Sequence, residues 1–474
     1  MKLTKQSDDF PQWYQDIVKE ADLAEPSFAR GTMVIKPYGY EIWERIQRHL
    51  DDRIKETGHK NLYFPMFIPS KLLDKEASHI EGFSPEVAVV THAGGNKLEE
   101  PLVVRPTSEA IIWGTYAKWV QSYRDLPLLY NQWANVVRWE MRPRLFLRTT
   151  EFLWQEGHTA HQTAKEAREE TLRMLEVYRE TAEQLLGIPV IAGRKSESER
   201  FPGADETYTI EALMRDGKAL QAGTSHDLGQ NFAKAYNVTF LDPDGKETHA
   251  YATSWGVSTR IIGGLIMTHG DDQGLRLPPS VAPYQAVIIP IVGDDTQGAV
   301  AKEATKLRDQ LAEEGIRVFL DDDDQSRPGF KFNKWEARGV PIRIELGPKD
   351  LEAKSVTLAR RDQDKKTTAK LSEVVKTVTK MLDDVQSSLL KDATAFRDEH
   401  THQPKDYESM AKLLSDQAGL VKTYWCGEEA CEQKVKQETK ATIRCLTLEP
   451  VKNPGKCLVC GKVGKEQSYW AKAY

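Results

Sequence analysis

The spacing of apolar residues in the first part of the chain predicts helices followed by strands. Residues 12–22 have the pattern of a short amphipathic helix, and a longer helix is predicted for residues 38–57. In the longer one, apolar side chains recur at every fourth position, which places them on one face, at Ile42, Ile46, Leu50 and Ile54. Gly58 is positioned to end this helix. The run NLYFPMFIP at 61–69 predicts an edge strand or a subunit boundary, because Pro65 has no N–H for a ladder hydrogen bond.

Charged residues interrupt the apolar pattern in the middle of the next predicted sheet, at residues 131–158. Two antiparallel strands are expected there, joined by a basic loop at 141–148. Side chains alternate between the faces of a strand, so Arg138 and Glu140 share one side of the first strand. On the second strand, one face carries Phe152, Trp154, Glu156 and His158. The segment is either an exposed, salt-bridged face or a binding surface for a charged, partly apolar small molecule.

Three further segments combine regular patterns with polar residues, and each leaves two interpretations open. After an apolar strand at 102–104, either the strand continues and Thr107 and Glu109 share a face, or Ser108 caps a helix. In the strand predicted at 218–228, Gly223 indicates close approach by a ligand or another backbone, or else a bulge. Arg260, where a strand passes into an apolar helix, favours an anion at the helix N-terminus or is a surface arginine paired with a carboxylate.

The remaining pattern divides the chain. A charged amphipathic helix is predicted for residues 164–187, and a hairpin for residues 242–246. The stretch LPPSVAP at 277–283 then marks a boundary, beyond which strands alternate with a helix, at 286–291, 299–314, 316–320 and 342–346. This alternation is typical of a small α/β domain with a mostly parallel sheet. A third part begins near Lys405 and contains all the cysteines.

Composition narrows the class of protein. The chain has 474 residues, enough for two or three domains, and its net charge of −6 gives no overall signal for nucleic acid or a membrane. The first residues are polar, without the apolar segment of a signal peptide, and no apolar run reaches membrane-spanning length. We therefore expect a soluble cytoplasmic protein without membrane association.

The cysteines are the most specific chemical pattern in the sequence. Cys426 and Cys431 form a C-x4-C pair, and Cys457 and Cys460 a C-x2-C pair. Two such pairs can place four thiolates tetrahedrally around Zn²⁺, which leaves Cys445 as a buried small side chain. The alternative is a set of reduced, unligated thiols. A zinc site here would be structural, because no ligand position stays open for water.

In this order, the motifs resemble those of class II aminoacyl-tRNA synthetases, and among these the prolyl-tRNA synthetases of the archaeal and eukaryotic-like type. The resemblance covers nearly the whole chain. NLYFPMFIP with the helix before it is similar to motif 1, RPTSE to the proline-binding loop, and NQWANVVRWE to FLWQEGH to motif 2. QAGTSHDLGQNF is similar to the strand before motif 3, and SWGVSTRIIG with LRLPP to motif 3 itself. KFNKWEARGVPIRIELGP and the final SYWAKAY extend the resemblance to the end of the chain.

The resemblance implies an α+β fold with an antiparallel-sheet catalytic domain at 1–280, an α/β anticodon-binding domain at 281–402 and a small α/β zinc-binding domain at 403–474. It also implies a homodimer that activates L-proline with ATP and Mg²⁺ and transfers it to tRNA(Pro). Between His158 and Gln221 there is no room for an inserted editing domain, so weak activation of alanine without clearance of Ala-tRNA is expected. The carboxylate of Tyr474 is expected to point back toward the active site.

Individual roles follow from the resemblance residue by residue. Arg138 and Arg260 are implied as the catalytic cations. Proline is expected to contact Thr107, Glu109, Arg138, Trp154, Glu156, His158 and His226. ATP is expected to contact Arg138, Glu140, Arg148, Thr149, Gln221, Thr224, Ser258 and Arg260. The expected zinc ligands are Cys426, Cys431, Cys457 and Cys460.

The same resemblance suggests that Glu336, Arg343 and Lys349 bind the guanines of the anticodon, although a salt-bridged α/β surface explains these residues equally well. The acidic run at 321–324 would repel a phosphate backbone. Two other functions stay open. One is a different class II synthetase, such as the threonine or glycine enzyme. The other is a synthetase-like binding protein without catalysis, which has no need of two cations around a nucleotide.

Overall fold

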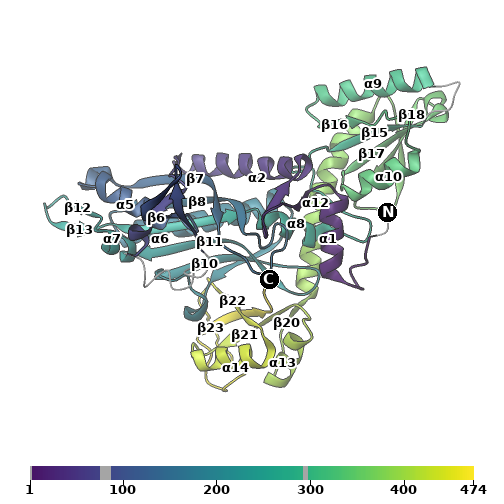
Figure 1. The fold of residues 1–474 in the computed structure, drawn as a ribbon. Coiled ribbons are helices and arrows are strands. Elements are labelled where there is room, and N and C mark those ends of the chain that lie inside the picture. Colours follow the sequence, from purple (N-terminus) through teal and green to yellow (C-terminus); the bar gives the residue numbers. More distant parts are fainter. Residues whose placement is uncertain (1–2, 75–86, 292–296) are drawn as a thin grey trace.

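A computed structural model describes residues 3–74, 87–291 and 297–474, and one large sheet runs through it (Figure 1). The sheet has eleven strands. In spatial order they are β20 (Thr401–His402), β21 (Leu420–Trp425), β23 (Glu466–Ala471), β22 (Thr442–Thr447), β9 (Val190–Arg194), β10 (Glu206–Leu213), β11 (Ala219–Gly229), β14 (Tyr251–Ser258), β8 (Glu151–His161), β7 (Leu128–Val137) and β3 (Lys60–Asn61). Neighbours are antiparallel except at the two ends, where β20 pairs with β21 and β3 with β7 in parallel.

β7 and β8, near the β3 end of this sheet, confirm the two strands predicted within residues 131–158. β7 and β8 pair from Leu128 opposite Ala160 to Val137 opposite Glu151. β14 lies on the other side of β8, from Tyr251 opposite His161 to Ser258 opposite Trp154. β7 ends before Arg138, so Arg138 and Glu140 belong to the loop that follows the strand and not to a strand face.

Helices cover the sheet and close its main core. α6 (Ala164–Glu180), which continues into a π-helical turn at Thr181–Leu185, packs on β10, β11 and β14. α1 (Phe10–Glu20), α2 (Pro37–Glu56) and α8 (Arg260–His269) contribute to the same apolar cluster. The predicted spacing in α2 is confirmed, because Ile42, Ile46, Leu50 and Ile54 are all buried there. A short hairpin of β1 (Ala24–Pro26) and β2 (Met33–Ile35) connects α1 to α2.

A second apolar cluster lies at the β3 end of the sheet, around α5 (Glu109–Trp119) and α7 (Asn231–Tyr236). Beside it, β4 (Phe67–Pro69), β6 (Asn96–Val104) and β5 (Ala88–Ala93) form a small sheet that leads into α3 (Ser70–Asp74). The single strand predicted at 61–69 is wrong: β3 and β4 belong to different sheets, and Pro65 lies between them. The hairpin at 242–246 is confirmed between β12 (Thr239–Leu241) and β13 (Glu247–His249).

Residues 286–370 form a separate five-stranded sheet, in the order β16 (Val318–Leu320), β15 (Ala286–Pro290), β17 (Ile342–Leu346), β18 (Ser355–Arg360) and β19 (Lys366–Lys370). The first three strands are parallel, and β18 and β19 are antiparallel additions, so the sheet is less parallel than predicted. Its helices are α9 (Gln297–Glu313), α10 (Pro328–Ala337), α11 (Pro348–Glu352) and the long α12 (Val374–Glu399), which leads to β20.

The C-terminal part adds α13 (Tyr407–Ser415) and α14 (Glu429–Thr439) to strands β20 to β23. These strands are not a sheet of their own, because β22 pairs with β9 through Leu446 opposite Arg194 and Thr447 opposite Gly193. The C-terminal segment, residues 401–474, therefore extends the large sheet at one edge (Figure 1). Within the described ranges, no helix is both long and apolar enough to cross a membrane.

Candidate active site

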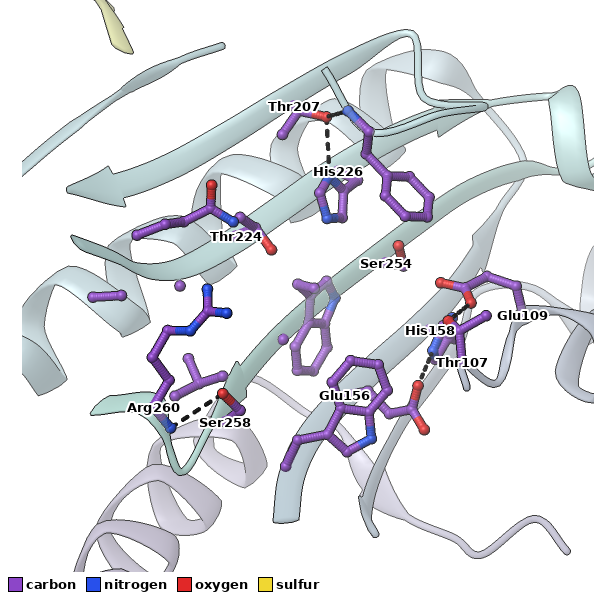
Figure 2. Close-up of a pocket in the computed structure, with 18 of the residues that line it drawn as sticks. Thr107, Glu109, Glu156, His158, Thr207, Thr224, His226, Ser254, Ser258 and Arg260 are labelled. Carbon is purple, nitrogen blue, oxygen red and sulfur yellow. Dashed lines mark hydrogen bonds and ion pairs between the residues drawn. The ribbon is translucent and has the colours of Figure 1, made fainter. Parts of the chain in front are cut away.

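A cavity of about 330 Å³ lies on one face of the large sheet, over β8, β10, β11 and β14 (Figure 2). It brings together every residue expected to bind proline and five of the eight expected to bind ATP. These residues are Thr107, Glu109, Arg138, Trp154, Glu156, His158, Gln221, Thr224, His226, Ser258 and Arg260. Their roles stay predictions, but their convergence from segments more than 100 residues apart is a property of the fold.

A second cavity of about 220 Å³ adjoins the first and shares Arg138, Ser258 and Arg260 with it. Its other polar lining comes from the loop between β7 and β8, with Glu140, Arg148 and Thr149. The remaining residues expected at ATP therefore lie here. The loop is anchored by Phe146 and Leu147, whose side chains are buried in the core.

Glu156 is the centre of a buried hydrogen-bond network at one end of the main cavity. Its Oε1 accepts from Ser108 Oγ and, at 2.6 Å, from Gln132 Nε2. Its Oε2 lies 3.0 Å from His158 Nε2. Burial alone would raise the pKa of Glu156, but the hydrogen bonds and charge of His158, with the other two partners, lower the pKa below its usual value. Glu156 is therefore a carboxylate at neutral pH.

The segment after β6 supplies a second carboxylate to the same end. α5 begins at Glu109, and Ser108 occupies the N-cap position. The helix alternative is thus correct and the continued strand is wrong, but the Ser108 hydroxyl bonds to Glu156 and makes no side-chain cap. Thr107 Oγ1 donates to Glu109 Oε2. Both Thr107 and Glu109 are buried and line the cavity (Figure 2).

His226 forms part of the wall on β11, opposite Thr207 of β10. Its Nδ1 lies 3.0 Å from Thr207 Oγ1, and its ring stacks at a tilt on Phe201, with centroids 4.6 Å apart. Burial, followed by the nearby His158, lowers the pKa of His226 to about 3. The ring is therefore neutral at physiological pH, and it adds a polar contact without adding charge.

Two arginines line both cavities. Arg138 Nε donates to the Pro106 carbonyl at 2.9 Å, and its guanidinium lies over the rings of Phe152 and Trp154, 5.7 and 5.5 Å from their centroids. These contacts hold the side chain where the two cavities meet, between the residues expected at proline and those expected at ATP. Trp154 Nε1 is buried with no hydrogen-bond partner among the described residues, so it can donate to a bound molecule.

Arg260 is the first residue of α8, and its Nε donates to the Leu147 carbonyl at 3.1 Å. None of the ion pairs among the described residues includes Arg260, so the carboxylate-paired alternative is wrong. Burial, together with the guanidinium groups of Arg148 and Arg138, lowers its pKa to about 10. It remains a cation at neutral pH, at the end of the cavity away from Glu109 and Glu156 (Figure 2).

The sheet also places groups in the cavity that the sequence did not single out. Thr207 and Ser254 line it beside His226, and Ser254 lies opposite both His226 and His158 in the strand ladders. Strand alternation from His226 would have identified both once the pairing was known. The irregular segment at 199–202 also contributes, but it has no periodicity from which to predict its position.

The bulge interpretation of Gly223 is confirmed, while close approach by a ligand stays a prediction. The β10–β11 ladder is irregular beside it, since Ile210 faces Gly223 and Glu211 faces Gln221. Gly223 also lines the main cavity, and a Cβ there would lie 3.1 Å from Val257 Cγ2. The bulge therefore occurs at the position where the backbone borders the cavity.

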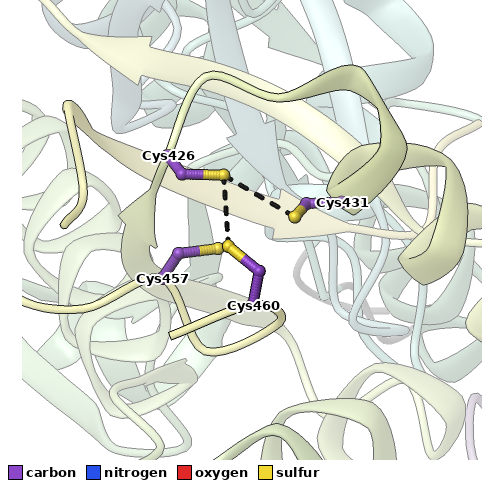
Figure 3. Close-up of side chains that lie close together, drawn as sticks. All are labelled: Cys426, Cys431, Cys457 and Cys460. Atoms are coloured by element: carbon purple, nitrogen blue, oxygen red, sulfur yellow. Dashed lines mark hydrogen bonds between the residues drawn. The ribbon is translucent and has the colours of Figure 1, made fainter. Parts of the chain in front are cut away.

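Cys426, Cys431, Cys457 and Cys460 form a compact cluster in the C-terminal part (Figure 3). Their Sγ atoms lie within 4.8 Å of one another, and the Sγ of Cys426 is 3.6 Å from those of Cys431 and Cys460. A tetrahedron with Zn–S bonds of about 2.3 Å has edges of about 3.8 Å, so the cluster fits zinc. The five cysteines form no disulfide, and Cys445 is buried apart from the cluster, as predicted.

The residues expected at the anticodon are only partly brought together. Glu336 and Arg343 line a cavity of about 220 Å³ on the five-stranded sheet, and Arg343 donates to Glu336 at 2.6 Å and to Glu345 at 3.0 Å. Arg343 is near the start of β17, whereas Lys349 lies beyond its end, in α11, and does not line this cavity. In the acidic run at 321–324, Asp321 is buried and accepts from Trp335 Nε1, so it does not face a phosphate backbone.

Tyr474 lies beside the β7–β8 loop. Its amide donates to the Ala219 carbonyl at 3.1 Å, and its hydroxyl to Asp216 at 2.7 Å. Its side chain lines a third cavity, of about 300 Å³, together with Pro143 and Leu147 of the loop. Tyr474 is therefore fixed next to the loop between β7 and β8, while the expected direction of its carboxylate stays a prediction.

Comparison with known proteins covers the whole chain. Three family models match: "tRNA synthetase class II core domain (G, H, P, S and T)" at residues 92–269, "Anticodon binding domain" at 285–381 and "Prolyl-tRNA synthetase, C-terminal" at 407–474. A proline–tRNA ligase of Alkaliphilus oremlandii is 55% identical over 473 residues, which is 100% of this chain and 98% of the relative. The proline–tRNA ligases of Porphyromonas gingivalis and Rubrobacter xylanophilus are each 54% identical, over 100% of this chain and 99% of their own lengths.

The cysteine cluster predicts one structural zinc ion per chain. Metal analysis of freshly purified protein should find about one zinc, and Cys457→Ser or chelation should remove it. Hydrogen exchange should then rise first in the start of α14 and in the loops that carry the other cluster cysteines, while β22, held between β9 and β23, should exchange later. Cys445→Ser is the matched control and should keep the metal. Zinc-free protein at purification would contradict the prediction.

The buried His226 predicts a loss of stability in mild acid. In the unfolded chain a histidine has a pKa of about 6.5, whereas in the fold the pKa of His226 is about 3. Below about pH 6.5 only the unfolded state binds this proton, so His226 lowers stability by up to about 1.4 kcal/mol for each further pH unit. In urea unfolding, His226→Asn should therefore show a shallower decline between pH 6.5 and 5 than the wild type. An equal decline would contradict a neutral, buried His226; His92→Asn, at an exposed histidine, is the control.

Proposed function

The chain belongs to the proline–tRNA ligases, and from this premise we propose how its residues perform the family's reaction. The enzyme activates L-proline with ATP to give prolyl-adenylate and transfers the prolyl group to the 3′ end of tRNA(Pro). The observation that carries the proposed site is the separation of charge in the main cavity. Glu109 and Glu156 lie at one end, and Arg260 at the other (Figure 2).

This separation matches the two charges of proline. Its secondary ammonium would be held by Glu109 and Thr107, while Trp154 provides a flat surface for the pyrrolidine ring. Glu156, His158 and the neutral His226 would close the pocket behind the ring. The carboxylate of proline then points toward Arg138, whose guanidinium already lies over the Trp154 ring at 5.5 Å.

On the other side of Arg138, MgATP would occupy the nucleotide end of both cavities. Its α-phosphate would lie between Arg138 and Arg260, with Gln221, Thr224 and Ser258 along the main cavity and Glu140, Arg148 and Thr149 along the second. The proline carboxylate attacks the α-phosphorus in line, and pyrophosphate leaves. Alignment and charge neutralisation by the two arginines suffice for this step, so no protein nucleophile is required.

In the second step, tRNA would contact both the catalytic part and the anticodon-binding part of the enzyme. The 3′-terminal adenosine would enter beside the β7–β8 loop, and its hydroxyl would attack the carbonyl of the adenylate and release AMP. We assign this chemistry to residues 1–280 and anticodon binding to residues 281–402. Within the latter, Glu336 and Arg343 suit guanine recognition, provided that tRNA displaces their mutual ion pair. Lys349, which follows the other end of β17, would contact a different part of the loop.

We further propose a homodimer. Among the described residues, β3 is the outermost strand at one end of the large sheet, and exposed large apolar side chains lie near it, with Tyr63 67% and Trp119 46% exposed. An open edge with such residues is typical of an interface.

Residues 403–474 would hold the structural zinc. Because tRNA charging serves the ribosomes, we place the enzyme in the cytoplasm.

The experiment that tests the function is ATP–pyrophosphate exchange on the purified chain. Exchange should depend on proline and should be absent with threonine and glycine. Arg260→Gln should lower kcat/KM by on the order of 100-fold or more, since it removes a charge that stabilises the transition state. Arg308→Gln, at an exposed arginine paired with its neighbour Asp309, is the matched control and should leave exchange unchanged.

Alanine provides a second arm of the same assay. The stretch from His158 to Gln221 contains α6, the short helical turns, β9 and β10, and no inserted domain. A pocket shaped for proline rejects a smaller side chain by only about 1 to 3 kcal/mol per missing methylene. Weak alanine-dependent exchange is therefore expected, with no deacylation of Ala-tRNA. Exchange without any amino-acid preference, or rapid deacylation, would contradict the proposal.

A further inference from the structure

A cluster of buried charges lies where the C-terminal segment joins the large sheet. Lys195 Nζ lies 2.7 Å from Glu211 Oε1, and Arg444 NH2 lies 3.0 Å from Glu211 Oε2. Arg444 Nε also donates to Glu211, at 3.1 Å. All three side chains are buried, with exposed fractions of at most 6%. The cluster holds two cations and one anion, so its net charge is +1.

The C-terminal segment holds this cluster at two points. Arg444 comes from β22, and its carbonyl accepts a hydrogen bond from Lys195 Nζ at 2.8 Å. Ser196, which follows Lys195 in the chain, donates to Glu432 of α14 at 2.8 Å. Glu211, by contrast, lies in β10, beside the active site, and Lys195 directly follows β9. The two parts of the molecule are therefore joined through charges and not only through apolar contacts.

The cluster is next to the cavity. Glu211 lies opposite Gln221 in the β10–β11 ladder, and Gln221 lines the cavity. Thr209 Oγ1 lies 3.0 Å from Glu211 and 3.4 Å from the carbonyl of Gly223, which also lines the cavity. Burial, Arg148 and Arg138 have the largest effects on the pKa of Arg260 and lower it; among the smaller effects, Glu211 raises that pKa and Arg444 lowers it.

A gain in folding stability does not account for the presence of buried charges at this position. Buried ion pairs are often no more stabilising than apolar side chains of the same size, because desolvation of the charges offsets their attraction. Their field, however, is weakly screened and reaches neighbouring sites. Without Arg444, the cluster would be neutral overall, and Glu211 would be a less compensated carboxylate near the phosphate end of the cavity. The carboxylate of Glu211 would then attract the guanidinium of Arg260 and repel the phosphates of ATP.

We propose that Arg444, supplied by the C-terminal segment, is a positioning residue for the nucleotide: with Lys195 it compensates Glu211 and so leaves Arg260 available for the α-phosphate. This inference rests on the assignment of the cavity around Arg260 to ATP. The C-terminal segment thereby contributes to proline activation without touching either substrate. No bond forms or breaks at the cluster, and its effect is on the affinity for ATP.

The test is a set of charge variants in pyrophosphate exchange and in equilibrium binding of ATP. Arg444→Gln should raise KM for ATP by about tenfold, the effect of one unit charge near a phosphate at intermediate dielectric. KM for proline should change much less. Adding Glu211→Gln to Arg444→Gln restores the net charge of +1 and should return KM for ATP close to the wild-type value. Arg444→Lys, which keeps the charge, should stay near the wild type.

A control variant separates this effect from simple loosening of the joint. Arg194, beside Lys195, forms an ion pair with Glu466 across the same boundary, and both side chains are 31% exposed. Arg194→Gln breaks this contact without touching Glu211, so KM for ATP should not change. If Arg444→Gln does not fold, Lys195→Met and its combination with Glu211→Gln provide the same comparison.

The inference is overturned if Arg444→Gln lowers the melting temperature but leaves KM for ATP unchanged. It is also overturned if Glu211→Gln fails to suppress the effect, or if Arg194→Gln raises KM for ATP as much as Arg444→Gln does. These outcomes differ from a failure of the proposed function, which would show as a wild-type chain without proline-dependent exchange.

Discussion

The register of β8 between β7 and β14 is the constraint on which the active site depends. It places Trp154 opposite Ser258, Glu156 opposite Gly256 and His158 opposite Ser254, all on the cavity side. A shift by one residue would turn these side chains to the other face of the sheet. Trp255 helps to fix the register, because a Cβ on Gly157 would lie 2.1 Å from its ring, so only glycine fits there.

On this framework, the site separates opposite charges. The carboxylates reach the cavity from β8 and from the start of α5, and Arg260 reaches it from the start of α8. Each is held by polar partners: Glu156 by Ser108, Gln132 and His158, and Arg260 by the Leu147 carbonyl. Because these groups are oriented before the substrates bind, little reorganisation is needed when charge moves from the proline carboxylate to the phosphate.

The sequence predicted what depends on local spacing. Strand alternation placed Trp154, Glu156 and His158 on one face, and the family motifs named the residues that converge on the cavity. Neither strand alternation nor the family motifs predicted contacts between distant segments. From the sequence, Ser108 was a candidate helix cap, but its hydroxyl bonds to Glu156, 48 residues away. The Glu211–Arg444 pair spans 233 residues, and neither residue has a distinctive neighbourhood in the sequence.

A crystal structure with a non-hydrolysable analogue of prolyl-adenylate tests the separation of charge in the active site most directly. We expect the pyrrolidine ring against Trp154, its ammonium at Thr107 and Glu109, and the phosphate mimic between Arg138 and Arg260. The adenine should extend toward the second cavity. An analogue bound with its ring at the Arg260 end, or outside the cavity altogether, would contradict the charge separation from which the mechanism is derived.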